Sequence, residues 1–282
     1  MTGDEAAATA VAARGSRNLL ARVVAALVLA PAAIAIAWAG GWFWTALASL
    51  GAIGLYVEWL MIVGIARQKR AVAAGTLALA CAGLALASGR LEVALTAIAA
   101  GLLLVLVLSP ERRGWVATGF CYAATAQLAS VVVRLDAAYG LAALMLVMLI
   151  VWVTDIGGYF AGRGFGGPKL WPRVSPKKTW AGAFGGFVAS LAVAAGFAGF
   201  GFGPTGPLLV LAAVLSIASQ LGDLFESAVK RRFGVKDSSH IIPGHGGLLD
   251  RLDGFVAAIV LAALIGMLRG GIDGVGRGLM VW

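Results

Sequence analysis

The sequence predicts an all-α membrane protein, a polytopic bundle of about nine transmembrane helices with the N-terminus in the cytoplasm. Of its 282 residues, 61% are hydrophobic and 12% are charged, and the mean hydropathy is +0.93. A soluble domain needs a more polar surface than this composition provides. The apolar runs reach about 20 residues, which is the length of a helix that crosses a bilayer. Regular alternation of polar and apolar residues, the pattern of a membrane β-barrel, is absent from the sequence.

Short polar connectors separate nine apolar runs, so we expect a single membrane domain over residues 17–282 that follows a disordered cytoplasmic tail over residues 1–16. The first run ends in Ala37-Trp38-Ala39, which resembles a signal-peptide cleavage site. Its lead-in is long and eight more runs follow, so the sequence favours an uncleaved helix. The expected spans are residues 20–39, 42–65, 71–88, 93–109, 115–133, 140–160, 180–202, 208–224 and 254–268.

The distribution of Lys and Arg predicts the orientation of the bundle. Eighteen of the 22 lysines and arginines fall in one set of alternate connections, and four fall in the other set. Cytoplasmic loops carry the excess of basic residues in membrane proteins. We therefore expect a cytoplasmic N-terminus, an external C-terminus and a cytoplasmic location for the basic connections. The net charge of +9 is explained in this way, without a nucleic-acid partner.

Two segments hold much of the remaining charge, residues 155–182 and residues 223–254. Together they contain ten of the 22 basic residues and six of the 13 acidic residues. Ionisable groups are costly near a membrane, so their clustering indicates a functional site. Asp155 lies inside an apolar run, where it faces either another helix or the site.

The second segment places acids and bases at helical spacing. Asp223, Glu226 and Lys230 share one helix face, and Asp250 and Asp253 lie one turn apart at the start of the last span. Carboxylates next to bases at a membrane surface suit Mg²⁺ shared with phosphates. A plain basic anchor explains Lys230 as well, and Glu226 could simply pair with it. Neither alternative explains the aspartates at the span ends.

Between these helices the sequence predicts a tight turn over residues 243–247. Gly246 and Gly247 allow backbone N–H groups to approach an anion. His245 contacts a phosphate or only shapes the turn; both interpretations remain open.

In the segment 155–182, residues 175–179 are typical of the start of a helix, with Ser175 as the N-cap and Pro176 at the first helical position. A helix N-terminus attracts phosphate, and Lys177 and Lys178 would strengthen that attraction. The alternative is an interfacial helix end with lysines that reach toward water. Residues 162–167 fit a G-x-G-x-x-G pattern, but no strand precedes them, so a dinucleotide-binding fold is rejected.

A longer pattern then becomes recognisable: Ser227-Ala228-Val229-Lys230-Arg231, Lys236-Asp237, His245-Gly246-Gly247 and Asp250-Arg251-Leu252-Asp253. It closely resembles the signature of the phosphatidate cytidylyltransferases, also called CDP-diacylglycerol synthases. The resemblance covers residues 140–268. Many relatives carry Glu at the position of Ala181 and Lys at that of Gly167, and both departures lie outside the 227–253 pattern.

The resemblance implies transfer of a cytidylyl group from CTP to phosphatidic acid, which gives CDP-diacylglycerol and pyrophosphate with Mg²⁺ and a second cation such as K⁺. The implied metal ligands are Asp223 and Asp250, and Asp253 lies close by as a third ligand or as a residue that orients the others. The implied catalytic residues are Asp223, Lys230, Arg231, Asp250 and Asp253. The implied substrate-binding residues are Ser175, Lys177, Lys178, Thr179, Ser227, Lys236, Asp237, His245, Gly246, Gly247 and Arg251. The chemistry of these residues agrees, because such a transfer needs positioning and neutralisation of charge and no strong general base.

The expected setting is the bacterial inner membrane with the active site on the cytoplasmic face, where CTP and the lipid substrate meet; a homodimer is left open. Two other functions were weighed. The CDP-alcohol phosphatidyltransferase motif begins at Asp250-x-x-Asp253-Gly254, but Ala258 replaces its Arg and its second half is missing. A transporter or channel is compatible with nine helices, yet its polar site would lie near the membrane midplane.

Overall fold

The computed structural model describes residues 28–239 and 246–282, and it confirms the all-α membrane bundle. Within this part of the chain, eight helices are long and apolar enough to cross a membrane. They are α2 (Gly41–Val63), α3 (Lys69–Ala87), α4 (Leu91–Leu108), α5 (Arg113–Leu135), α6 (Gly140–Gly164), α7 (Trp180–Gly199), α8 (Thr205–Arg232) and α9 (Leu249–Gly270). A shorter apolar helix, Val28–Ala39, occupies the described part of the first expected span. The expected tail over residues 1–16 lies outside the described residues.

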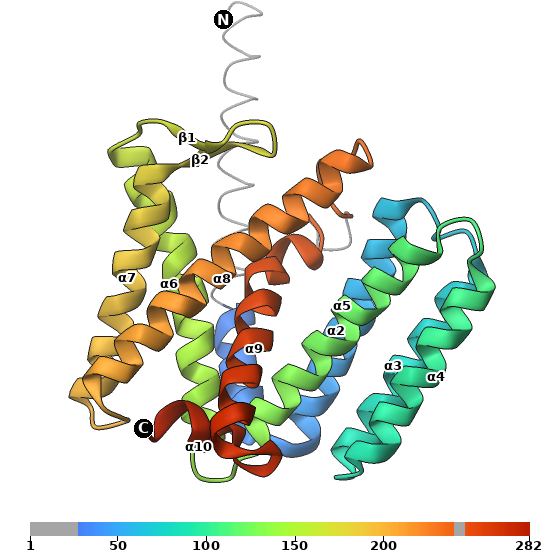
Figure 1. The fold of residues 1–282 in the computed structure, drawn as a ribbon, viewed down its shortest axis with the longest axis horizontal. Coiled ribbons are helices and arrows are strands. Elements are labelled where there is room, and N and C mark those ends of the chain that lie inside the picture. Colours follow the sequence, from blue (N-terminus) through green and yellow to red (C-terminus); the bar gives the residue numbers. More distant parts are fainter. Residues whose placement is uncertain (1–27, 240–245) are drawn as a thin grey trace, which may run out of the picture.

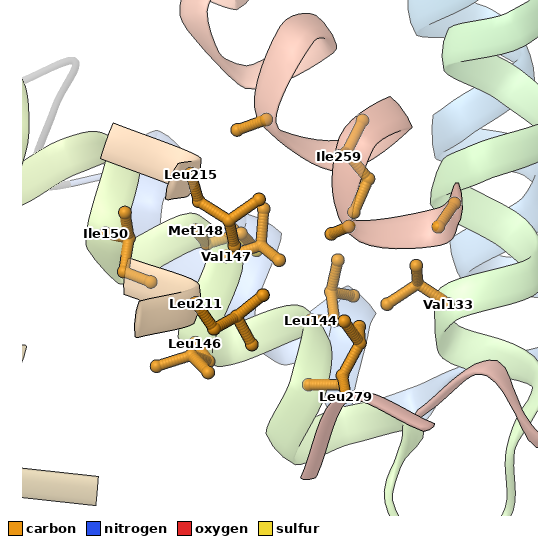
Figure 2. Packing of buried hydrophobic residues seen from close by; sticks show 14 of the residues in the cluster. Val133, Leu144, Leu146, Val147, Met148, Ile150, Leu211, Leu215, Ile259 and Leu279 are labelled. Atoms are coloured by element: carbon orange, nitrogen blue, oxygen red, sulfur yellow. The ribbon is translucent and has the colours of Figure 1, made fainter. Parts of the chain in front are cut away.

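The helices pack as neighbours along the chain (Figure 1). The hairpins α3–α4 and α6–α7 lie on opposite sides of the bundle, and α8 runs obliquely across it. A short helix, α10 (Val275–Met280), follows α9 after a single turn of 3₁₀ helix over Ile272–Gly274 and packs against α9 and α6. One large apolar cluster joins α6, α8, α9 and α10, and Figure 2 shows its centre. Leu144 of α6, Leu211 of α8 and Ile259 of α9 are fully buried there.

Small residues let α8 and α9 approach closely. A Cβ atom on Gly222 of α8 would lie 2.6 Å from the carbonyl oxygen of Asp253 on α9, so only glycine fits. Gly254 of α9 packs in the same way against Ser219 of α8. Such contacts are the usual means of helix association in lipid. They bring the start of α9 against the part of α8 that carries Asp223.

The connection between α6 and α7 corrects one prediction. It forms an antiparallel hairpin of β1 (Lys169–Trp171) and β2 (Ser175–Thr179), so Ser175 does not cap a helix. α7 begins at Trp180, and its N-cap is Thr179, whose Oγ1 accepts a hydrogen bond from Gly182 N at 3.0 Å. Thr is also a favourable N-cap residue, and pairing with β1 gives the backbone of residues 175–179 hydrogen-bond partners that a free helix end would lack.

Candidate active site

Lys230 bridges two carboxylates at the end of α8. Its Nζ lies 2.5 Å from Asp250 Oδ1 on α9 and 2.6 Å from Glu226 Oε2, one turn earlier on α8. All three side chains are largely shielded from solvent. Glu226 is buried, and the ammonium group of Lys230 is its ion-pair partner. The predicted pairing of Glu226 with Lys230 is therefore present, and Asp250 shares the same lysine.

Asp250 is held by the segment that precedes α9. Its Oδ2 accepts hydrogen bonds from Ser238 N at 3.1 Å and Gly247 N at 3.0 Å, and it shares the single hydroxyl proton of Ser238, whose Oγ is 3.1 Å away, with Glu58. A Cβ atom on Gly247 would overlap Ser238 Oγ and the carboxylate of Glu58, which explains the glycine at this position. Gly246 has a φ of 81°, a backbone conformation that glycine adopts readily. The glycines of the predicted turn thus shape the surroundings of Asp250, and His245 lies outside the described residues.

Glu58 of α2 is a site residue that the sequence analysis missed. It is fully buried and accepts four hydrogen bonds of 2.7–2.8 Å. The donors are the hydroxyls of Ser238 and Ser239 and the backbone N–H groups of Leu248 and Leu249. The last two belong to the start of α9, where a negative charge also complements the helix dipole. The available signal was a lone acid inside an apolar run, which is costly unless it has a role.

A second group of carboxylates comes from three helices. Asp223 of α8 forms an ion pair with Lys178 of β2. Asp155 of α6 and Asp253 of α9 are both close enough to Asp223 to feel its negative charge, and Asp253 also feels that of Asp155. Asp155 feels the positive charge of Arg251 as well. The fold therefore answers the open question about Asp155, because this side chain faces the site.

The contacts within this second group are few. Asp253 Oδ1 accepts a hydrogen bond from the backbone N–H of Gly254 at 2.7 Å. Ser227 Oγ lies 3.4 Å from Asp223 Oδ1, at the weak end of hydrogen bonding. Among the described residues, these three carboxylates face two basic groups, Lys178 and Arg251, and accept few hydrogen bonds, which leaves oxygen atoms for other ligands.

Other predicted site residues lie farther out along the same segments. The side chains of Lys177, Lys236 and Asp237 are exposed, and Arg231 is exposed with its guanidinium bonded to Val235 O at 3.1 Å. These positions suit contact with a soluble ligand. The predicted roles of all these residues in substrate binding stay predictions.

The donor set around the second group fits Mg²⁺ in a particular way. Among residues 28–239 and 246–282, no three His, Cys, Asp or Glu side chains are arranged to hold a metal ion by themselves. Protein-bound Mg²⁺ usually takes only one or two carboxylates and completes its shell with water and substrate phosphates. Mutually repelling carboxylates with unused oxygen atoms match that mode of binding.

A hollow of about 470 Å³ lies away from these carboxylates, between the start of α5 and the end of α8. It is lined by Arg112, Arg113 and Arg232 together with Trp115 and Phe233. It shares no lining residue with the carboxylates. We place the site at the carboxylates, because they carry chemistry that a basic surface hollow does not.

The elements β2, α8 and α9 come together at one end of the helical bundle (Figure 1). The contacts of Lys178 with Asp223 and of Lys230 with Asp250 gather lysines and carboxylates there, an arrangement that suits a membrane-embedded enzyme that handles phosphates. Comparison with known proteins gives the class. The model of the cytidylyltransferase family matches residues 20–268. Phosphatidate cytidylyltransferase from Brucella suis is 39% identical over 252 residues, which cover 88% of this chain and 93% of the relative.

Two further relatives match the chain over shorter regions. Phosphatidate cytidylyltransferase from Haemophilus influenzae is 47% identical over 131 residues, 44% of this chain and 45% of the relative. The enzyme of the same name from Bacillus subtilis is 47% identical over 120 residues, 42% of this chain and 45% of the relative. The chain therefore belongs to the phosphatidate cytidylyltransferase family, a family of nucleotidyltransferases.

Proposed function

We propose that the carboxylates and lysines shared by β2, α6, α8 and α9 are the site at which this chain carries out the reaction of its family. In that reaction CTP and phosphatidate give CDP-diacylglycerol, and pyrophosphate is released. The observation that carries the proposal is the convergence of Asp155, Asp223 and Asp253 from three separate helices. The family match over residues 20–268 supports a single catalytic domain over residues 17–282.

In the transfer, an oxygen atom of the phosphatidate phosphate attacks the α-phosphorus of CTP. The new P–O bond forms as the bond to the pyrophosphate oxygen breaks, and the ionised lipid phosphate needs no base to remove a proton. The protein must hold the reacting atoms in line and neutralise the phosphates. Lys178, Lys230 and Arg251 surround the carboxylates and supply positive charge.

Asp223, Asp250 and Asp253 would hold Mg²⁺, which supplies neutralisation of the triphosphate when it is bound. Asp223 and Asp253 have oxygen atoms available for this. The Oδ2 atom of Asp250 already accepts three contacts, whereas Oδ1 meets only Lys230, so a metal ion would bind most readily at Oδ1 after Lys230 turns away. Lys230 is the donor that can leave, because its flexible ammonium group also has Glu226.

This exchange gives Lys230 a second task. When the nucleotide is bound, its ammonium group turns from Asp250 toward a phosphate oxygen and remains paired with Glu226. Arg231, Lys236, Lys177 and Asp237 would contact the outer part of the nucleotide, since they are exposed on the segments around the site. Ser175, Thr179, Ser227 and His245 would complete the substrate-binding set. A site for K⁺ stays a prediction.

The chain is an integral membrane protein with bacterial relatives. We place the site on the cytoplasmic face of a bacterial inner membrane. The support is the 18-to-4 distribution of basic residues, because the connections on the basic side include β1, β2 and the segment between α8 and α9. A homodimer stays a prediction, which light scattering of the detergent-solubilised protein would decide.

The experiment that tests the proposed site uses purified protein, phosphatidic acid, Mg²⁺ and CTP labelled at the α-phosphate. Label should enter the lipid phase with the native chain, and both EDTA and Asp223→Asn should abolish the transfer. Asp273→Asn is the matched control, because Asp273 is an exposed aspartate in the turn after α9, outside the site. Full activity of Asp223→Asn would remove the carboxylate group from the mechanism. Absence of transfer by the native chain would overturn the function itself.

A further inference from the structure

An apolar groove of about 350 Å³ runs between α5 and α9. Its lining includes Tyr122 and Thr125 of α5 and Val256, Val260 and Leu264 of α9. All of these residues lie inside membrane-spanning helices. Thr125 and Leu264 are exposed on the side of the bundle. In a membrane that surface faces hydrocarbon, so the groove opens sideways into the bilayer.

One stripe of α9 connects this groove to the candidate active site. Val256, Val260 and Leu264 follow Asp253 at spacings of three, seven and eleven residues. Residues at these spacings lie on one face of a helix. The carboxylate of Asp253 therefore stands at the top of the same face that lines the groove below.

Tyr122 lies at the junction of the two regions. Its ring lines the groove and stacks on Trp59, with ring centroids 5.7 Å apart, and Phe225 of α8 lies 6.2 Å away. Its hydroxyl is buried, has no hydrogen-bond partner among the described residues, and feels the negative charge of Asp253 and Glu226. A buried hydroxyl without a partner is costly, so this one is suited to donate a hydrogen bond to a ligand.

We infer that the groove between α5 and α9 binds one acyl chain of the phosphatidate substrate. The inference rests on the proposed function, because it takes its ligand from that reaction. The chain lies along Val256, Val260 and Leu264, and the hydroxyl of Tyr122 donates to an oxygen of the lipid head group. The head group then lies beside Asp253, where the nucleotide reacts. The groove would thus determine how strongly the enzyme distinguishes long from short acyl chains.

The test compares Thr125→Trp with Thr96→Trp. Thr125 faces the groove, whereas Thr96 lies on α4 away from it. Both are exposed threonines whose hydroxyl bonds, at 2.8 Å, to the carbonyl oxygen four residues earlier. An indole at position 125 fills part of the groove. We expect KM for dioleoyl phosphatidate in mixed micelles to rise roughly tenfold, the effect of losing the burial of about two methylene groups.

Three further kinetic measurements accompany the KM of Thr125→Trp for dioleoyl phosphatidate. KM for CTP should stay as in the native chain, KM for dihexanoyl phosphatidate should change little, and Thr96→Trp should resemble the native chain with both lipids. Equal kinetics of the two Trp variants at every chain length would overturn the inference. So would an equal rise of KM for short and long chains. An inactive native chain would instead refute the proposed function, so the two failures are distinguishable.

A second measurement does not depend on any variant folding. Phosphatidate with a photoactivatable diazirine in one acyl chain is irradiated with the native protein, and the labelled peptides are identified by mass spectrometry. Label should appear on α5 and α9 and should be displaced by excess phosphatidate but not by phosphatidylcholine. Equal displacement by both lipids would show that the groove holds bulk bilayer lipid, which contradicts the inference.

The Tyr122→Phe variant tests binding of the lipid head group separately from binding of the acyl chain. The ring and its stacking on Trp59 are kept while the hydroxyl is removed. KM for phosphatidate should rise roughly fivefold for short and long chains alike, as expected for one lost hydrogen bond. Unchanged kinetics of Tyr122→Phe would contradict the placement of the head group beside Asp253.

Discussion

Two groups of carboxylates lie at the same end of the bundle, and their surroundings are opposite. Glu58 and Asp250 each accept four hydrogen bonds or ion-pair contacts, largely from the segment that leads into α9. Asp155, Asp223 and Asp253 mainly face one another, with Lys178 and Arg251 as partners. The first group is satisfied by the protein itself, whereas the second is arranged so that added cations would stabilise it.

The comparison indicates that the first group of carboxylates stabilises the fold and that the second group serves the reaction. The donors to the first group are backbone N–H groups and serine hydroxyls of the segment before α9 and of its first turn. Because these donors belong to the chain itself, their hydrogen bonds to Glu58 and Asp250 fix the geometry of that segment. Clustered like charges destabilise a folded protein, and they persist where function requires them. Lys230 binds Asp250 of the first group and Glu226, and in the proposed mechanism its ammonium group also turns to a phosphate.

The largest effect is expected for Asp250→Asn. Removing this charge leaves Lys230 with only Glu226, and breaking a buried ion pair costs about 3–5 kcal/mol. The apparent unfolding temperature in detergent should fall strongly, together with activity. Asp273→Asn is the matched control, because Asp273 is an exposed aspartate outside the site. A variant with native stability would show that Asp250 belongs with the second group.

Asp223→Asn should show the reverse pattern. Transfer of labelled cytidylyl groups should fall by about 100-fold or more, since charge stabilisation in the transition state is lost. The unfolding temperature without Mg²⁺ should stay close to that of the native chain or rise, because repulsion among the carboxylates is relieved. Mg²⁺ should raise the unfolding temperature of the native chain but not of this variant. A strong loss of stability of Asp223→Asn without Mg²⁺ would show that Asp223 stabilises the fold in the same way as Asp250, which contradicts the distinction between the two groups.

Glu58→Gln should have an intermediate effect. The amide NH₂ of Gln faces donors that need an acceptor, so we expect a loss of about 2 kcal/mol of stability. Hydrogen exchange at Leu248 and Leu249 should become faster, and kcat should fall more than KM for CTP. Glu92→Gln on α4 is the control, an exposed acid in a membrane-spanning helix. Unchanged exchange at the start of α9 would mean that Glu58 does not hold this segment.

The smallest effect concerns Asp136, a third well-satisfied acid, which lies between α5 and α6 outside the spans. Burial raises the pKa of this carboxyl, but hydrogen bonds from the backbone N–H groups of Tyr139, Arg277 and Ala138 outweigh it, so the pKa lies below its ordinary value. A lowered pKa stabilises the fold above the ordinary value of about 3.9. That contribution is lost as the pH falls through the folded-state pKa.

Asp136→Asn should therefore be less stable than the native chain at pH 7, and the difference should shrink below pH 4. Thermal unfolding measured between pH 3 and pH 7 checks this. A difference that is constant over the whole range would contradict a role of the ionised carboxylate.

Much of the fold was predictable because each span is a long apolar run, and the ends of the observed helices lie within a few residues of most expected limits. α8 is the exception, since it continues to Arg232 where the apolar run ends at residue 224. Its charged final turns are stabilised by partners on other elements, Lys178 and Asp250. Composition alone does not reveal such partners.

The site was predictable where its residues are close in sequence, as in residues 223–253. Glu58 could not be assigned, because its partners lie 180 or more residues away along the chain. The side to which Asp155 points depends on how α6 packs against α8. The helix start at Ser175 was misplaced because Ser-Pro and Thr are both good N-cap signals, and only pairing with β1 decides between them.

The length of α8 has a consequence for the depth of the reaction. Its 28 residues span about 42 Å, longer than a hydrocarbon layer of about 30 Å, so the helix must tilt or emerge. Figure 1 shows α8 oblique to its neighbours. Where the apolar part of α8 fills the hydrocarbon layer, its charged last turns, with Asp223 and Lys230, would extend to the level of the phospholipid phosphates. A lipid can diffuse sideways to this height and react without being lifted from its leaflet, while a water-soluble nucleotide arrives from above.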